Sequence, residues 1–243
     1  MKESWKQLQD WIKEAKQMVF FGGAGVSTES GIPDFRGEAG IYQTISEFGV
    51  RPEEILSHSF FLRDPETFYA YYKKYMLFPD AKPNAAHLAL ARLEQEGKLT
   101  AVITQNIDGL HQKAGSQRVY ELHGSVRKNH CLRCGKQYPL AYIQKAEGVP
   151  RCSCGGMVRP DIVLYEEGLD EKVLYGAVAQ LQKADLLLVG GTSLNVYPAA
   201  GLLQYFGGKH LVLINRDETP MDGQADLVLH DKIGEVLGAV VGV

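Results

Sequence analysis

Short, mostly apolar runs recur along this chain and are separated by segments with helical periodicity. Five runs have the length of a buried strand: residues 19–21, 99–104, 118–122, 185–190 and 210–214. Strands that are apolar on both faces are typical of a parallel sheet covered by helices on either side. The alternation of such strands with helices predicts an α/β fold built on a doubly wound, Rossmann-like parallel sheet.

The intervening segments carry signals for helices. Apolar residues recur at helical spacing at Trp5, Leu8, Ile12 and Ala15. Asp64 and Pro65 are residue types favoured at the N-cap and first position, so a helix is predicted to begin there. Another helix is predicted within residues 84–97, because the segment ends in a glycine.

The composition is that of an ordinary globular protein. The chain has 243 residues, of which 45% are apolar and 23% charged, with a formal net charge of −3. It contains no long basic run, so nothing favours nucleic acid or an anionic membrane surface as a partner. Residues 1–16 lack the apolar core of a signal peptide, and no apolar run approaches the ~20 residues that span a bilayer. We expect a cytoplasmic monomer.

Four cysteines form two pairs, in the stretches "CLRCG" and "CSCGG". In a reducing compartment, paired cysteines followed by glycine indicate a zinc site rather than disulfides. Four thiolates leave no open position for water, so the metal should be structural. The second pair is separated by one residue instead of two, which keeps His130 as an alternative ligand. The predicted ligands are Cys131, Cys134, Cys152 and Cys154.

The cysteines also define the predicted domain organisation. Residues 124–160 are rich in cysteine, glycine and charge and interrupt the alternation of strands and helices. We expect them to form a small zinc-binding module inserted into a Rossmann-like domain made of residues 1–123 and 161–243.

A glycine-rich loop follows the first predicted strand, in "VFFGGAGVSTESGIPDFRG". Such loops let the backbone approach a phosphate closely. The dinucleotide fingerprint is not met, because Gly23 and Gly25 fit its first two positions but Thr28 occupies the third. No lysine follows at P-loop spacing either.

Further polar segments follow the other predicted strands: "TQNIDGLH", "ELHG", "GTSL" and "NRDETP". Ligands of open parallel sheets bind at the carboxyl ends of the strands, so these segments should meet in one polar cleft. Taken singly, each also fits a structural role: "TQNID" a capped turn, and His123 a hydrogen-bonded histidine at a domain edge.

Taken together, these segments resemble the motifs of the sirtuins, the NAD-dependent protein lysine deacylases. The motifs "GAGVSTESGIPDFRG", "TQNIDGLH", "ELHG", the paired cysteines, "GTSLNVYP" and "INRDETP" occur in the family's order, from about Trp5 to Val240. The resemblance implies an enzyme that uses NAD as co-substrate, holds one structural zinc, and deacetylates acetyl-lysine in protein or peptide substrates.

The resemblance also implies functional residues. The NAD-binding residues would be Gly23, Ala24, Gly25, Ser27, Thr28, Asp34, Phe35, Arg36, Gln105, Asn106, Ile107, Asp108, His123, Gly191, Thr192, Ser193, Asn215 and Ile233. Of these, Ala24, Thr28, Phe35 and Arg36 would line the pyrophosphate and nicotinamide-ribose side, and Thr192, Ser193 and Asn215 the adenosine side. The catalytic residues would be His123, Asn106 and Asp108, with Asp108 accepting a hydrogen bond from the nicotinamide carboxamide.

The implied reaction transfers the acetyl group to ADP-ribose. The acetyl oxygen would attack C1′ of the ribose as nicotinamide leaves. His123, as general base, would then relay a proton from the ribose hydroxyls so that the 2′-oxygen attacks the imidate. An imidazole, with an ordinary pKa near ~6.5, is well matched to accepting a proton at neutral pH. The products would be free lysine, nicotinamide and O-acetyl-ADP-ribose.

The chain departs from the family pattern where the acyl-lysine peptide is expected. Sirtuins commonly have Phe-Gly-Glu after the zinc module, whereas Tyr165 and Glu166 replace the aromatic-glycine pair here. The peptide is expected to add as a strand between this segment and "SLNVYP". The candidate substrate contacts are Val163, Tyr165, Asn195, Val196 and Tyr197.

Acyl selectivity is predicted from the helix that reads "FYAYYKKYMLF". Sirtuins that prefer succinyl or malonyl groups resemble one another in carrying Tyr-x-x-Arg there, and this helix has no arginine. We therefore expect neutral acyl groups to be preferred, with Lys73 and Lys74 as the alternative partners of an acyl carboxylate.

Four other functions compete with this one. A hydride-transferring Rossmann dehydrogenase is disfavoured by the missing third glycine. A non-catalytic NAD-binding or zinc-scaffold module is disfavoured by the presence of His123 and Asn106. An NAD-dependent ADP-ribosyltransferase would use the same cleft and the same loss of nicotinamide, and it remains the nearest alternative, beside a deacylase of other acyl groups.

Overall fold

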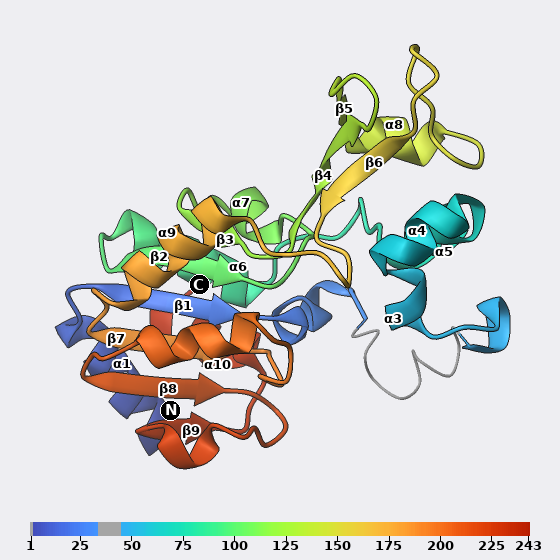
Figure 1. The fold of residues 1–243 in the computed structure, drawn as a ribbon. Coiled ribbons are helices and arrows are strands. Elements are labelled where there is room, and N and C mark those ends of the chain that lie inside the picture. Colours follow the sequence, from blue (N-terminus) through green and yellow to red (C-terminus); the bar gives the residue numbers. More distant parts are fainter. Residues whose placement is uncertain (1, 34–44) are drawn as a thin grey trace.

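The computed structural model describes residues 2–33 and 45–243. In these residues, a parallel sheet of six strands has the order β3-β2-β1-β7-β8-β9, and an antiparallel sheet of three strands has the order β5-β4-β6. Figure 1 shows the two sheets in separate parts of the molecule. We call the six-stranded sheet with its covering helices the large lobe. The small lobe consists of the three-stranded sheet with helices α3, α4, α5 and α8.

The five strands predicted from the apolar runs are all present in the large sheet. It contains β1 (Met18–Gly22), β2 (Leu99–Thr104), β3 (Val119–Glu121), β7 (Leu186–Gly190), β8 (His210–Ile214) and β9 (Leu227–Leu229). Along β1, Met18 and Phe20 point into one core, while Val19 and Phe21 point into another. The strand is apolar throughout because both of its faces are covered.

Helices cover both faces of the sheet. α1 (Glu3–Glu14), α6 (Ala85–Gln95) and α10 (Ile233–Val241) pack into the core that contains Phe20. α9 (Glu171–Leu181) and the 3-10 segment η3 (Ala199–Tyr205) pack into the core that contains Phe21. This arrangement confirms the predicted doubly wound fold. Within the described ranges, no helix combines the length and apolarity needed to cross a membrane.

Two predicted helix starts are confirmed. α5 (Pro65–Tyr75) follows Asp64, whose side chain accepts a hydrogen bond from the backbone N–H of Thr67 at 3.1 Å. Asn84 caps α6 by accepting a hydrogen bond from the N–H of Ala86 at 2.9 Å. The amide of Asn84 also donates to the carbonyl of Val26 at 2.7 Å. This cap therefore ties α6 to the loop that follows β1.

The chain order opens a crevice at the centre of the large sheet. From β1 the chain moves outward to β2 and β3, returns to β7 on the other side of β1, and continues through β8 and β9. The connections that leave β1 and β7 therefore diverge at the carboxyl edge. Open α/β sheets bind ligands at such a point.

The small lobe is built around β4 (Gly124–Cys131), which pairs with β5 (Gln137–Pro139) and β6 (Val158–Ile162). Its helices are α3 (Pro52–Ile55), α4 (His58–Arg63), α5 and α8 (Leu140–Lys145). The core of this lobe joins aromatic residues of α4 and α5, such as Phe61 and Tyr69, to Ile143 and Val158.

This core bears on the domain boundaries predicted from the sequence. The prediction assigns residues 1–123 to the Rossmann-like domain, yet α4 and α5 pack against the sheet that carries the cysteines. The chain therefore contributes to the small lobe twice, before and after β2 and β3 (Figure 1). The boundaries of an inserted module at residues 124–160 stay a prediction.

Candidate functional site: a two-sided cleft and a cysteine cluster

The loops after β1 and β7 touch through their backbones. The N–H of Gly25 donates to the carbonyl of Gly191 at 2.8 Å. A Cβ at Gly25 would lie 2.7 Å from the Cα of Gly191, closer than any side chain tolerates. Gly191 also has a positive φ of 59°, a conformation that glycine adopts at little cost. Both glycines are therefore required for the two loops to meet at the crevice.

The loop after β1, which contains η1 (Ala24–Val26) and η2 (Thr28–Ser30), separates two cavities. One has a volume of about 300 Å³ and is lined by Ala24, Ser27 and His123; we call it the histidine cavity. The other has a volume of about 370 Å³ and is lined by Gly25 and Thr28; we call it the glycine cavity. Neighbouring residues of one short loop thus face different cavities, so a two-part ligand could reach both.

The glycine cavity gathers Thr192, Ser193 and Asn215, the residues predicted for the adenosine side, from the ends of β7 and β8, together with Thr28, which was predicted for the pyrophosphate and nicotinamide-ribose side. Its lining includes Gly25, Thr28, Gly191, Thr192, Ser193, Asn215 and Ile233. These residues are far apart in the sequence but follow neighbouring strands. The lining also contains Glu29 and Arg216, which the sequence analysis did not single out.

Glu29 holds the helix that closes the glycine cavity. Its carboxylate accepts a hydrogen bond from the N–H of Gly234, in the first turn of α10, at 2.7 Å. A carboxylate at a helix N-terminus is stabilised by the helix dipole. A Cβ at Gly234 would lie 2.7 Å from a carboxylate oxygen of Glu29, so a side chain at this position would displace the carboxylate. The pairing crosses most of the sequence, and no local pattern signals it.

In the histidine cavity, polar side chains that follow β1 and β2 form one hydrogen-bonded chain. The amide of Asn106 donates to Oγ of Ser27 at 3.1 Å, and that hydroxyl donates to Oδ2 of Asp108 at 2.7 Å. The other carboxylate oxygen of Asp108 accepts the N–H of Leu110 at 2.8 Å. Three predicted site residues are therefore held together, with the Asn106 amide oriented by a neighbour instead of by solvent.

Burial raises the pKa of Asp108 above its ordinary value. The hydrogen bonds from the Leu110 N–H and the Ser27 hydroxyl, and the nearby charge of Arg127, act in the opposite direction. A carboxylate that is buried with few compensating charges keeps strong hydrogen-bonding capacity for a ligand in the same cavity.

His123, which follows β3, also lines the histidine cavity. Its Nδ1 lies 2.9 Å from the backbone carbonyl of Gln105. A carbonyl can only accept, so Nδ1 carries the proton and Nε2 is the basic nitrogen of the neutral ring. Gln105 is itself fixed, because its N–H donates to Gly22 and its side-chain amide donates to Thr192. The loops after β1, β2 and β7 thus determine which ring nitrogen can accept a proton.

The predicted substrate contacts form the outer wall of the histidine cavity. Val163, Tyr165, Val196 and Tyr197 line it, and Asn195 is exposed beside them. Both backbone polar groups of Tyr165 are already used: its N–H donates to Leu56 and its carbonyl accepts from His58. Tyr165 can therefore contact a peptide through its side chain but not by strand pairing at these two groups. Ile107, another predicted site residue, also lines this cavity.

Three predicted NAD-binding residues cannot be placed. Asp34, Phe35 and Arg36 lie outside the described residues. Gly23 does lie within them, at the base of the crevice. Its N–H donates to the carbonyl of Gly190 at 3.3 Å.

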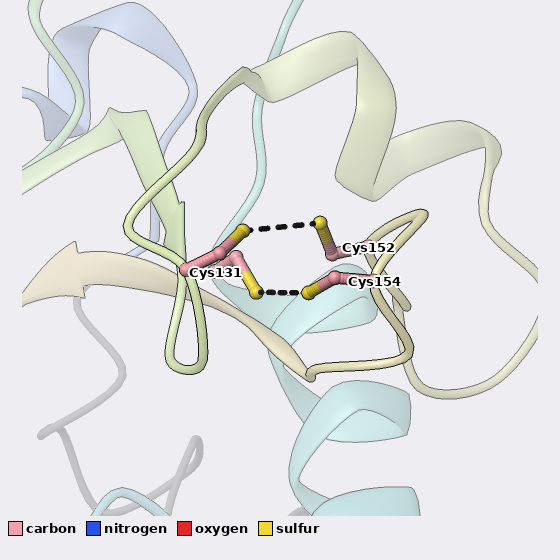
Figure 2. Close-up of side chains that lie close together, drawn as sticks. Cys131, Cys152 and Cys154 are labelled. Atoms are coloured by element: carbon pink, nitrogen blue, oxygen red, sulfur yellow. Dashed lines mark hydrogen bonds between the residues drawn. The ribbon is translucent and has the colours of Figure 1, made fainter.

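The four cysteines converge in the small lobe. All four Sγ atoms lie within 4.8 Å of one another. The Sγ atoms of Cys131 and Cys154 are 3.5 Å apart, and those of Cys134 and Cys152 are 3.6 Å apart. Figure 2 shows Cys131, at the end of β4, facing Cys152 and Cys154 on another segment of the chain. Four thiolates around one zinc at ~2.3 Å stand slightly under ~4 Å from each other, so the cluster fits a structural zinc.

His130, the alternative ligand, points elsewhere. Its Nδ1 is hydrogen-bonded to the carboxylate of Asp161 on β6, and the cluster of potential ligands contains only the cysteines among the described residues. Side chains alternate along a strand, so His130 faces away from the neighbouring Cys131. The tight spacing of Cys152 and Cys154 is accommodated by a turn in which Gly155 donates to the carbonyl of Cys152 at 2.8 Å.

Comparison with known proteins decides the family. A family model described as "Sir2 family" matches residues 23–198. The chain belongs to the Sir2 family, the sirtuins. Two relatives are NAD-dependent protein deacetylases of Clostridium acetobutylicum and Cutibacterium acnes, 55% and 57% identical over 237 and 235 residues. Each alignment covers 97% of this chain, and they cover 97% and 96% of the relatives, respectively.

A solved sirtuin structure extends the likeness to three dimensions. It is described as "Sir2-p53 peptide-NAD+" and superimposes with a TM-score of 0.87 at 41% identity, covering 100% of this chain and 98% of that one. The resemblance inferred from the motifs is therefore confirmed, and the cavities described above belong to a sirtuin fold.

Sequence reasoning used the segment 68–78 to predict acyl selectivity but did not single out the side chains that form one wall of the histidine cavity. Pro52, Leu56, Tyr71 and Tyr75 line it from α3, from the residue after it, and from α5. Their pattern is that of an ordinary amphipathic core, and only the packing of the small lobe turns these residues toward the cleft. Glu166 also lines the cavity, and its departure from the family pattern was the signal that could have marked it.

Proposed function

We propose that this sirtuin is an NAD-dependent protein lysine deacetylase that transfers the acetyl group to ADP-ribose. The observation that carries the proposal is the loop after β1 with a cavity on each side. One cavity holds the oriented histidine and the buried carboxylate, and the other holds the glycine-lined surface at the sheet crevice. NAD is the co-substrate whose two halves fit this division, and the zinc is structural.

The relatives support this reaction. The proteins of C. acetobutylicum and C. acnes are named NAD-dependent protein deacetylases. The matched structure is described with a p53 peptide and NAD+. At more than half identity over nearly the full length of both chains, the reaction named for these relatives is a strong guide to the reaction here.

Each side chain has a proposed task. Asn106 and Asp108 bind and orient the nicotinamide half, and Thr192, Ser193 and Asn215 bind the adenosine half. His123 accepts a proton at Nε2 while its Nδ1–H stays on the Gln105 carbonyl, which keeps the ring in one orientation. General base catalysis from such a position contributes about 10²–10⁴ to the rate.

Neutral acyl groups are proposed as the preferred substrates. Lys73 Nζ donates to the carbonyls of Ala146 and Gly148 at 2.6 and 2.7 Å, and Lys74 Nζ lies 2.6 Å from the carboxylate of Glu47. Both cations are therefore engaged elsewhere, and the described lining of the histidine cavity contains no lysine or arginine. A buried succinyl carboxylate would lack a compensating charge.

Incubation with NAD and an acetylated peptide, followed by mass spectrometry, tests the proposal. The expected products are the deacetylated peptide, nicotinamide and O-acetyl-ADP-ribose. Transfer of ADP-ribose to protein would favour the ADP-ribosyltransferase alternative, and NAD left unconsumed would favour a non-catalytic module. The succinylated form of the same peptide should react slower, by on the order of tenfold or more. A preference for succinyl would contradict the acyl selectivity but not the reaction.

A further inference from the structure

Glu166 stands where sirtuins commonly have glycine, in a backbone conformation that suits glycine. Its φ is +76°, in the left-handed region that costs a residue with a Cβ about 1 kcal/mol or more. Glutamate is therefore retained here against a local penalty, and its side chain offsets the penalty through specific contacts.

Those contacts hold the carboxylate in one place. The backbone N–H of Ser59 donates to one oxygen at 2.9 Å, and the Ser59 hydroxyl donates to the other at 2.9 Å. Both hydrogen bonds lower the pKa of Glu166, with the backbone bond the larger cause, so the group is ionised at neutral pH. Ser59 is neutral, so the hydrogen bonds orient the charge without cancelling it.

The other acidic groups of the histidine cavity are balanced locally. Arg159 forms a two-point pair with Glu167 at 2.7 and 3.0 Å, and His58 adds a third contact at 2.7 Å. Asp108 is half-buried and accepts hydrogen bonds from Ser27 and Leu110. Glu53 lies 3.5 Å from Arg51. Among the described lining residues, Asp108 and Glu166 are the carboxylates with no cation in hydrogen-bonding contact, and Glu166 is the exposed one of the two.

Two exposed aromatic side chains line the same cavity. Tyr165 is 40% exposed and Tyr197 is 75% exposed, and both line the cavity with Glu166. The stem of a long cationic side chain packs well on a tyrosine ring while its charged head meets a carboxylate. This combination suits arginine or lysine and disfavours an acidic residue.

We propose that Glu166 is a specificity-determining residue that makes the enzyme favour acyl-lysine peptides with an arginine or lysine within two residues of the acyl-lysine. The inference rests on the proposed deacetylase function and names a class of substrate for it. An extended peptide advances ~3.4 Å per residue, so residues within two positions of the acyl-lysine stay near the cavity mouth.

The test uses acetyl-lysine peptides that are identical except at one flanking position. That position carries arginine, glutamine or glutamate, and it is moved from two residues before the acetyl-lysine to two residues after it. With the wild-type enzyme, we expect kcat/KM for the arginine peptide to exceed that for the glutamate peptide about three- to tenfold at one or more positions, which is the scale of an exposed ion pair and its like-charge counterpart. The difference should lie in KM and shrink at high salt.

Two variants separate a charge effect from a structural one. Glu166→Gln removes the charge but keeps an oxygen for Ser59. In this variant, the ratio of kcat/KM for the arginine peptide to that for the glutamate peptide should fall towards one. Glu14→Gln removes an equal charge from the exposed end of α1, in the large lobe, and should keep the wild-type ratio. Because the ratio is taken within each variant, it does not depend on the fraction of active protein.

Three results would overturn the inference. The first is a wild-type ratio of kcat/KM, arginine peptide over glutamate peptide, near one at every position, and the second is a ratio that persists in Glu166→Gln. The third is an equal loss of kcat/KM for all three peptides in Glu166→Gln, which would show a purely structural role. Failure of the wild-type enzyme to deacetylate the glutamine peptide would instead overturn the proposed function, and the inference with it.

Discussion

The two lobes are stabilised in different ways. In the large lobe, every residue of β1 and β7 is buried, and the two cores on either side of the sheet are almost entirely aliphatic and aromatic. In the small lobe, β5 is largely exposed and β6 alternates between buried and half-buried positions. Its core depends on aromatic residues of α4 and α5 and on cysteines.

This difference gives the two lobes different roles: the large lobe carries the predicted reacting groups, and the small lobe supplies part of the cavity wall. The large lobe has two extended apolar cores, and the predicted catalytic residues lie at the carboxyl edge of its sheet. The small lobe has a smaller core that includes cysteines, and small units of this kind commonly depend on a structural metal. Residues of both lobes line the histidine cavity. Substitutions should therefore reduce activity in two distinct ways, either by removing a reacting group or by destabilising a wall of the cavity.

His123→Ala should produce the largest effect by removing chemistry and leaving both lobes intact. We expect turnover of an acetylated peptide to fall by about 10²–10⁴, because the general base is lost. The melting temperature and the affinity for NAD, measured by calorimetry, should change little. Near-normal turnover would remove His123 from the mechanism.

Cys131→Ala should destabilise the small lobe and leave the large lobe folded. Losing one of the four thiolates should abolish tight binding of about one zinc per chain, and kcat/KM should fall by roughly tenfold or more as the cavity wall loosens. The matched control is Ser153→Ala, between Cys152 and Cys154, which should keep its zinc and activity. Metal-free protein with normal melting and full activity would contradict the structural role of the site.

Asp108→Asn should affect stability and catalysis in the large lobe in opposite directions. Burial raises the pKa of this carboxyl, so its ionised form costs stability, and that cost grows as pH rises from the ordinary value through the raised one. At neutral pH the variant should melt about 2–4 °C higher while turnover and inhibition by nicotinamide both weaken. The gain in melting temperature should vanish near pH 4, and a gain independent of pH would contradict the explanation.

His111→Leu should give the smallest effect, visible only as a pH dependence. Burial lowers the pKa of His87 to about 4 and that of His111 well below its ordinary value. Within the part of the chain that the structure describes, neither ring nitrogen of His111 has a hydrogen-bond partner. The two neutral histidines leave the free energy of unfolding undiminished above pH ~6.5. As pH falls from there towards ~4, the unfolded chain binds protons that the buried rings do not, and the free energy of unfolding decreases by up to ~1.4 kcal/mol per pH unit for each histidine.

Replacing His111 should therefore flatten the loss of stability between pH 6.5 and 4.5, measured by urea unfolding at several pH values. Acid also protonates metal-bound thiolates, so zinc release should be followed in parallel and should be the same in both proteins. An unchanged slope would show that acid acts through the small lobe instead of through the buried histidines.

Local sequence patterns determined the framework of the large lobe. The apolar runs predicted five of its strands, since a strand covered on both faces must be apolar at every position. Asp64 predicted a helix start because capping depends on residues only two or three apart. Polar residues after the strands predicted the cleft, because the carboxyl ends of parallel strands share one edge. The paired cysteines predicted the metal cluster for a similarly local reason.

Only the tertiary structure decided what those patterns leave open. Glu29 reaches Gly234, Ser59 holds Glu166, and Asp161 takes His130 away from the metal cluster. α4 and α5 join the small lobe although they precede β2 in the chain. Each of these contacts joins residues distant in sequence whose local pattern fits several partners equally well. Packing selects among those partners, because a buried polar group must be satisfied and a cavity must be filled by whatever side chain the fold brings to it.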